Sequence, residues 1–190
     1  MKSNKNLDIR EANDLLTDQI MKSASSCAHK FKEEITRVDK KGELNIDFIK
    51  AYQIFYEFMY FFLAMVMKKT SKIMRYEKWI DYLIIFNKTF LFRATEYIYG
   101  DKDPTGKKFD FLKSLFGNLN NVVTSYLEIA DKSPFDESLA DELGRRLAKL
   151  IGKKCKKEYI ILASRLARVE LSNFDVANLF DRVIDFESFK

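Results

Sequence analysis

The chain has 190 residues, of which 47% are hydrophobic and 32% are charged, a composition typical of a globular rather than a disordered protein. Its 6 glycines and 2 prolines disfavour β-rich and βαβ folds, which need turn-forming residues every few positions. A single histidine and two cysteines leave few ways to build a catalytic or metal site, and a net charge of +5 is too small to indicate a polyanionic partner by itself.

The first predicted element is a helix over about residues 7–38. Apolar residues recur there every three or four positions, which is the spacing of one face of a helix. The residues on this face are Leu16, Ile20, Ala24, Cys27, Phe31, Ile35 and Val38. Gly42 follows and can adopt the left-handed backbone conformation that commonly ends a helix.

A second helix is predicted from a cap at Asn45 to about Thr70. Its apolar residues cover well over half of the circumference, and only a narrow polar stripe remains, through Lys50, Gln53, Glu57 and Lys68. A helix that is apolar nearly all round is surrounded by other helices, so this one is expected at the centre of the fold. Its apolar run at residues 58–67 is interpreted as core, because a bilayer span needs about 20 apolar residues.

The rest of the chain continues the helical pattern, with short breaks between segments. Further helices are predicted over about Arg75–Tyr99, Lys107–Ala130, Ser133–Ile151, Tyr159–Val169 and Asp175–Phe186. Gly152 either ends the helix before it or merely weakens that helix. The whole pattern predicts an all-α fold: residues 1–190 form a single helical-bundle domain of five to seven helices around the nearly all-apolar helix at 45–70.

The start of the chain and its cysteines predict a cytoplasmic location. The basic start, from Met1, is followed by acidic residues rather than by an apolar segment, so no secretory signal is expected. Cys27 and Cys155 are 128 positions apart and form no CxxC pattern, and two reduced thiols are the simplest interpretation.

Few residues are candidates for chemistry. His29 is the only imidazole and lies about opposite the apolar face of its helix, so it is expected to point to water. Glu57 lies on the polar stripe of the second helix, and a partly exposed carboxylate is expected there rather than a buried acid. No catalytic, cofactor-binding or metal-binding residue is therefore predicted, and the chain is expected not to be an enzyme.

The helix at 75–99 carries apolar residues on the side that also holds its charged residues. The candidate interface residues on that side are Tyr82, Ile85, Phe92 and Tyr99. Apolar side chains on a polar face suggest a second contact surface, for another subunit or a partner. The same pattern also fits a helix that is buried on two sides by its own neighbours, and both interpretations stay open.

Positive charge is concentrated near residue 150, where residues 153–170 carry four of the five net charges. If one helix continues through Gly152, six cations share an arc of about 120°. These candidate phosphate-backbone contacts are Arg145, Arg146, Lys149, Lys153, Lys156 and Lys157. Such a strip could bind nucleic acid, although no aromatic residues are interleaved for base stacking, and a solvated helix face is the favoured explanation.

These patterns favour a non-enzymatic helical protein that acts through protein–protein contacts, as a homodimer or in a small complex. The alternative is a nucleic-acid-associated protein that uses the basic face at 145–168. A third class, a sensor that binds an apolar ligand among the aromatic residues, is the least favoured, because aromatic-rich cores are usually just packed.

Overall fold

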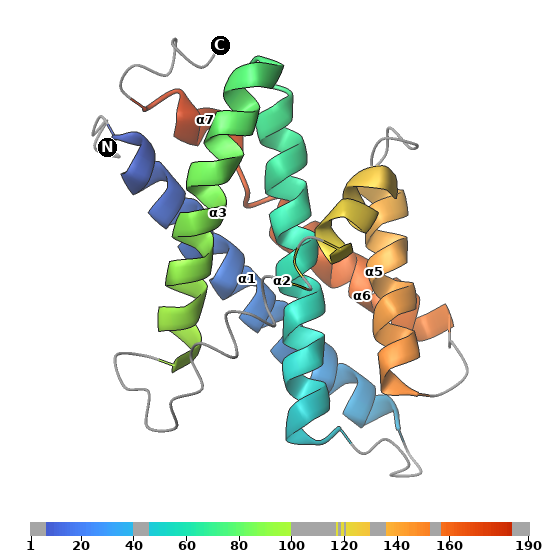
Figure 1. Ribbon diagram of the computed structural model, residues 1–190. Coiled ribbons are helices and arrows are strands. Elements are labelled where there is room, and N and C mark those ends of the chain that lie inside the picture. The colour runs from blue at the N-terminus through green and yellow to red at the C-terminus, as the bar shows by residue number, and fades with distance from the viewer. Residues whose placement is uncertain are drawn as a thin grey trace, which may run out of the picture. The chain divides into compact units, whose positions relative to one another are not determined.

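The computed structural model describes residues 7–39, 46–99, 121–129, 136–152 and 157–183, together with residues 117 and 119. These residues form helices and no strand, and the only β-type pairing among them is a single bridge between Leu7 and Val183. The helices (Figure 1) are α1 (Ile9–Val38), α2 (Phe48–Ser71), α3 (Tyr76–Tyr99), α5 (Asp136–Ile151), α6 (Lys157–Leu171) and α7 (Val176–Phe180). Residues 121–129 are helical as well. The all-α prediction, with its five to seven helices, is confirmed.

The chain divides into two compact units. Unit 1 comprises Met1–Met21, Met65–Asn121 and Asp175–Lys190, and unit 2 comprises Lys22–Ala64 and Val122–Phe174. Helices α1 and α2 each contribute to both units, so neither unit is a simple stretch of sequence. A single cooperative domain over residues 1–190 therefore stays a prediction.

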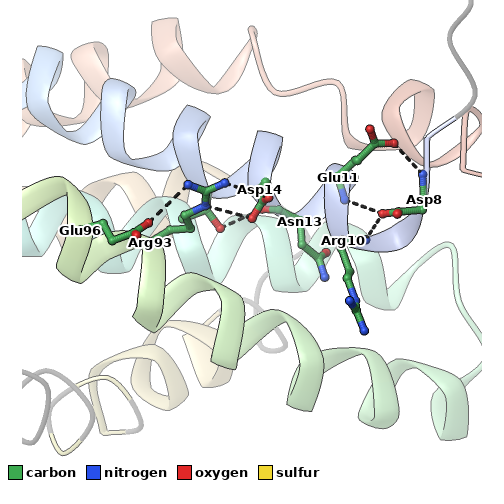
Figure 2. Close-up of polar contacts among 8 residues, drawn as sticks. Asp8, Arg10, Glu11, Asn13, Asp14, Arg93 and Glu96 are labelled. Atoms are coloured by element: carbon green, nitrogen blue, oxygen red, sulfur yellow. Dashed lines mark hydrogen bonds and ion pairs between the residues drawn. The ribbon is translucent and has the colours of Figure 1, made fainter. Parts of the chain in front are cut away.

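Acidic residues cap the first two helices. The Asp8 carboxylate accepts hydrogen bonds from the backbone N–H groups of Arg10 (2.8 Å) and Glu11 (2.7 Å), and the Glu11 carboxylate accepts one from the Asp8 N–H (3.1 Å). This reciprocal arrangement (Figure 2) is a capping box, which satisfies N–H groups that the helix itself leaves without acceptors. At the start of α2, the Asp47 carboxylate accepts the Lys50 N–H at 2.8 Å, so Asp47 provides the cap. The predicted cap, Asn45, lies outside the described residues.

The core of unit 2 is rich in aromatic residues from α2. Every residue from 58 to 67 is buried, which confirms that the apolar run is core. Phe62 stacks on Phe174 with ring centres 5.2 Å apart, and Phe61 contacts Tyr126 edge-on at 6.0 Å. The start of α2 departs from the prediction. Phe48 and Ile49 are exposed there, and the continuous run of buried residues begins only at residue 58.

Helices α5 and α6 pack directly against each other inside unit 2 (Figure 1). A β-carbon built on Gly144 would lie 2.7 Å from the Cα of Ile160, so only glycine allows this close approach. The Ser164 hydroxyl also donates a hydrogen bond to the Ala140 carbonyl at 2.9 Å. These contacts fix the position of α5 relative to α6.

The core of unit 1 forms around α3. Tyr82 stacks on Phe86 (ring centres 5.6 Å apart) and contacts Phe180 of α7 edge-on (5.5 Å). The Trp79 indole N–H donates a hydrogen bond to the Thr70 hydroxyl at 3.2 Å, which ties α3 to the end of α2. One side of α3 is thus held by its own unit.

Across the described ranges, no helix has the length and apolar character that crossing a bilayer requires.

The predicted inner face of α1 is largely confirmed. Its apolar residues from Leu16 to Ile35 are buried, whereas Val38, at the last position of the helix, is exposed. His29 is exposed as predicted, with its Nε2 atom 3.2 Å from the carboxylate of Glu33 one turn later.

Candidate functional site

Helix α3 presents an unusual concentration of apolar side chains to solvent. Of the twelve large hydrophobic residues exposed in the described ranges, six lie on this one helix: Tyr76, Ile80, Ile84, Ile85, Phe92 and Tyr97. Phe92 is 64% exposed, Ile84 54% and Ile85 40%. Single exposed apolar residues are common on protein surfaces, whereas a gathering on one helix is a candidate contact site.

Helical spacing explains why four of these residues face outward together: Ile80, Ile84, Ile85 and Phe92. Tyr76 and Tyr97 lie near the two ends of α3, at angles on the side of Phe86 and Phe90. Ile80, Ile84, Lys88 and Phe92 follow one another at intervals of four, and Ile85 lies beside this row. Residues Phe86 and Phe90 belong to the opposite side, which packs into unit 1. We call the five residues Ile80, Ile84, Ile85, Lys88 and Phe92 the outer face of α3.

Two of the four residues predicted for this surface need separate comment. Tyr82 is fully buried, so it cannot form part of an exposed interface, and that assignment is wrong. The physical reason is its position one turn before Phe86, which places its ring in the stack that packs against Phe180. The side chain of Tyr99 lies outside the described residues. Ile85 and Phe92 are exposed, as a contact surface requires.

A groove of about 650 Å³ runs along α1 and α3 beside the outer face. Both helix segments belong to unit 1. The lining residues are Arg10, Asp14, Ile85, Lys88, Thr89, Phe92 and Arg93. The groove therefore combines two apolar side chains of the outer face with three cations and one acid.

Arg93 joins the two sides of the groove. Its guanidinium donates two hydrogen bonds to the Asp14 carboxylate, at 3.1 and 2.9 Å, and a third to Glu96 at 3.3 Å. Figure 2 shows the side chain reaching from α3 between these two acids. A two-pronged arginine–carboxylate pair has a fixed geometry, so it holds α1 and α3 in register. The hydrogen bonds and the charge of Asp14 also raise the pKa of Arg93.

The other two cations of the groove have no acidic partner among the described residues. Arg10 and Lys88 take part in no ion pair there, and Figure 2 shows the Arg10 side chain extending away from Asp8 and Glu11. Asp14, the only acid in the lining, is occupied by Arg93. The groove therefore keeps an uncompensated positive charge next to its apolar residues.

A second cleft, of about 730 Å³, lies between α2 and α5 in unit 2. It is lined by Gln53, Glu57, Glu142, Arg145, Arg146, Lys149 and Leu150, and so contains three of the predicted phosphate contacts. Leu150 is its only apolar lining residue.

Most polar groups in this second cleft satisfy one another. Glu142 accepts hydrogen bonds from the Nε atoms of Arg145 (3.0 Å) and Arg146 (3.1 Å). Arg146 also donates to the Ser125 hydroxyl at 2.8 Å and lies over the Tyr126 ring, 4.9 Å from its centre. Both arginines therefore have partners within the protein.

Glu57 is half-buried at the edge of this network, as predicted. Its carboxylate accepts a hydrogen bond from the Tyr126 hydroxyl at 3.3 Å. Burial raises the pKa of Glu57, while the charge of Arg146 and the Tyr126 hydrogen bond oppose that rise. Burial also raises the pKa of the Tyr126 hydroxyl. Glu57, Tyr126 and Arg146 therefore form one cluster of contacting polar groups at the edge of the cleft.

The predicted basic strip does not exist as one helical arc. Gly152 has a φ of +78°, and α5 ends at Ile151, one residue before it. Lys157 is the first residue of a separate helix, α6. Lys153 and Lys156 lie outside the described residues. The cations at 145–149 and Lys157 are therefore on two different helices rather than on one helical arc.

Comparison with known proteins gives no match, whether with family models, curated proteins or solved structures. Within the described ranges, no three His, Cys, Asp or Glu side chains gather closely enough to hold a metal ion. The α1–α3 groove and the outer face of α3 are the candidate site, defined by their shape, polarity and charge.

Proposed function

We propose that this chain is a non-enzymatic, cytoplasmic protein-binding module whose contact surface is the outer face of α3 with the adjoining groove. The observation that carries the proposal is the exposure of four large apolar side chains on this one face of α3, out of twelve exposed in the described ranges: Ile80, Ile84, Ile85 and Phe92. Leaving apolar surface in water costs free energy, about 25 cal/mol per Å², and a partner that covers it recovers that cost.

The surface is supported by a well-fixed framework. The inner side of α3 is packed through Tyr82 and Phe86, and Arg93 holds α3 against α1. Rigid positioning lowers the entropic cost of binding, because little ordering is needed when a partner arrives. Phe92 is the natural anchor, since large aromatic side chains dominate the energetics of protein interfaces.

Two further observations support the non-enzymatic and cytoplasmic parts of the proposal. In the α2–α5 cleft, Arg145, Arg146 and Glu57 are engaged by internal partners, which suits a structural role. Cys27 is a buried free thiol whose pKa burial raises to about 12, which suits an inert side chain in a reducing compartment.

Site-specific photo-crosslinking tests the proposal directly. A photoreactive benzoylphenylalanine replaces Phe92, which is exposed and tolerates a larger ring, in cells that produce the protein. We expect a discrete crosslinked product after irradiation. The matched control places the same residue at Ile161, which is 56% exposed but lies on α6, where we expect no such product. Equal crosslinking at both positions, or none at Phe92, would refute the proposal.

Nucleic-acid binding remains the second candidate because one cation of the α2–α5 cleft, Lys149, has no acidic partner among the described residues. Affinity for duplex and single-stranded probes at several salt concentrations tests it. We expect no binding tighter than micromolar near physiological salt. Tight binding that Arg145→Gln with Lys149→Gln weakens across all sequences would establish this function instead.

A further inference from the structure

The α1–α3 groove has a specific combination of apolar and charged features. Ile85 and Phe92 are seven residues apart, so they lie on the same side of α3, about 10.5 Å apart along its axis. This distance equals two helical turns, which is the spacing of apolar residues at positions i and i+7 of a partner helix. A helix that lies along α3 can therefore match both side chains at once.

The charge of the groove selects among such helices. Arg10 approaches from α1 and Lys88 lies between Ile85 and Phe92, and neither has an acidic partner in the described part of the chain. The third cation, Arg93, is already held by Asp14 and Glu96. A partner that carries acidic residues beside its apolar stripe would supply the two missing counter-charges.

A second copy of this chain fits the groove less well. In a two-fold symmetric contact that sets Ile85 of each copy against Phe92 of the other, the axis passes next to Lys88. The two Lys88 side chains would then face each other, and like charges brought together at an interface are unfavourable. A nucleic acid is also a poor match, because apolar side chains flank the two groove cations that lack acidic partners among the described residues.

We propose that the α1–α3 groove binds an acidic amphipathic helix of another protein. Its apolar residues contact Ile85 and Phe92, and its carboxylates pair with Arg10 and Lys88. This inference rests on the proposed function, since it names the kind of partner that covers the outer face of α3.

A designed peptide provides the probe. It is a fluorescent helix of about 18 residues with leucines at positions i, i+4, i+7 and i+11 and glutamates flanking that stripe. Fluorescence anisotropy with the full chain should show saturable binding that weakens as salt is added. The matched control peptide carries lysine in place of every glutamate and should bind at least about tenfold more weakly.

Three variants locate the peptide in the groove. Phe92→Ala should weaken binding of the glutamate peptide by about tenfold or more, because it removes the apolar anchor. The double variant Arg10→Glu with Lys88→Glu should also weaken binding of the glutamate peptide by about tenfold or more. It should strengthen binding of the lysine peptide. Lys149→Glu, an equal change of charge per site in the α2–α5 cleft, should leave both affinities unchanged. The inference is overturned if the glutamate peptide binds no more tightly than the lysine peptide. It is also overturned if the groove variants leave the affinity for the glutamate peptide unchanged.

The outcomes also separate this inference from the proposed function. If the glutamate peptide does not bind but crosslinking at Phe92 is specific, the proposed contact surface stands and only the acidic helix is refuted. A dimeric solution mass that Phe92→Glu reduces to a monomer would show that a second copy is the occupant. Failure of both the peptide and the crosslink would refute the inference and the proposed function together.

Discussion

The α2–α5 cleft and the α1–α3 groove have similar volumes, about 730 and 650 Å³, and both contain arginines beside acids. They differ in how far these charges are satisfied internally. In the cleft, Arg146 contacts Glu142, Ser125 and the Tyr126 ring. In the groove, only Arg93 is engaged, while Arg10 and Lys88 lack acidic partners among the described residues.

The two sites also differ in their apolar surface. Leu150 is the only apolar residue that lines the cleft, whereas the groove continues into the exposed outer face of α3 through Ile85 and Phe92. A polar network that is satisfied internally stabilises the fold, because few of its groups gain from an external partner. Exposed apolar surface and unpaired charge, in contrast, are stabilised when an external partner covers them. The two sites therefore differ in their exposed apolar surface and unpaired charge, and not in their size.

The largest effect is expected at Gly144, which sets the position of the helix that carries the charges of the cleft. Gly144→Ala places a β-carbon 2.7 Å from the backbone of Ile160 and should destabilise the protein by about 1–3 kcal/mol. Gly117→Ala is the control, since that helical position is open and alanine favours helix. Urea unfolding measures both variants, and equal midpoints would contradict the tight contact between α5 and α6.

Removal of one positive charge from each site should lower the unfolding free energy by different amounts. Arg146→Ala leaves Glu142 without one donor and removes the positive charge that favours ionised Glu57, and should cost about 1–3 kcal/mol of unfolding free energy. Lys88→Ala should cost less than about 0.5 kcal/mol, because no partner of Lys88 is lost. Chemical denaturation of both variants checks this difference. Similar losses would mean that the two sites do not differ as described.

A buried amide on α1 should destabilise unit 1. Asn13 is fully buried, and neither its side-chain oxygen nor its nitrogen has a hydrogen-bond partner among the described residues. Asn13→Leu replaces these groups with an apolar side chain of similar size and should raise the unfolding free energy by about 1 kcal/mol. Thermal and urea unfolding measure the gain, and a loss of stability would reveal a partner for the amide.

The smallest expected effect on stability comes from Glu57 and depends on pH. Because burial raises the pKa of Glu57 in the folded protein, its ionised form is disfavoured there relative to the unfolded chain. The contribution of Glu57 to wild-type stability should therefore be highest below the ordinary pKa of a glutamate and should fall as pH rises through the raised value. Glu57→Gln keeps an acceptor for the Tyr126 hydroxyl and removes this fall.

The measurement is the urea midpoint of both proteins from pH 3 to 8. The midpoints should coincide at the acid end, and Glu57→Gln should be more stable near neutral pH. A wild type that gains stability relative to the variant as pH rises would show that Arg146, rather than burial, dominates the pKa of Glu57.

The positions of the helices were predictable because helical periodicity is a local property of the sequence. The predicted ranges 7–38 and 75–99 differ by at most two residues from Ile9–Val38 and Tyr76–Tyr99. Periodicity also indicated that the third helix has apolar residues on two sides. It could not decide which residues at the edge of each face are covered, so Tyr82 was assigned to the wrong one.

The groove itself could not be predicted, because it depends on contacts between residues far apart in sequence. Arg93 and Asp14 are separated by 79 positions, and neither residue type nor local pattern links them. One available signal was missed: Ile80, Ile84, Lys88 and Phe92 recur at intervals of four and mark the outer face directly. For the basic strip, the sequence left the role of Gly152 open, and its positive φ decided against a continuous helix.

The variant Phe92→Glu distinguishes a binding surface on the outer face of α3 from packed core. We expect this variant to keep its helical circular dichroism and its urea midpoint, because Phe92 is exposed. It should at the same time lose the crosslinked product formed by a photoreactive residue at Ile85, one of its neighbours on the outer face. Unfolding of the variant, or an unchanged crosslink in a folded variant, would contradict the proposed binding surface.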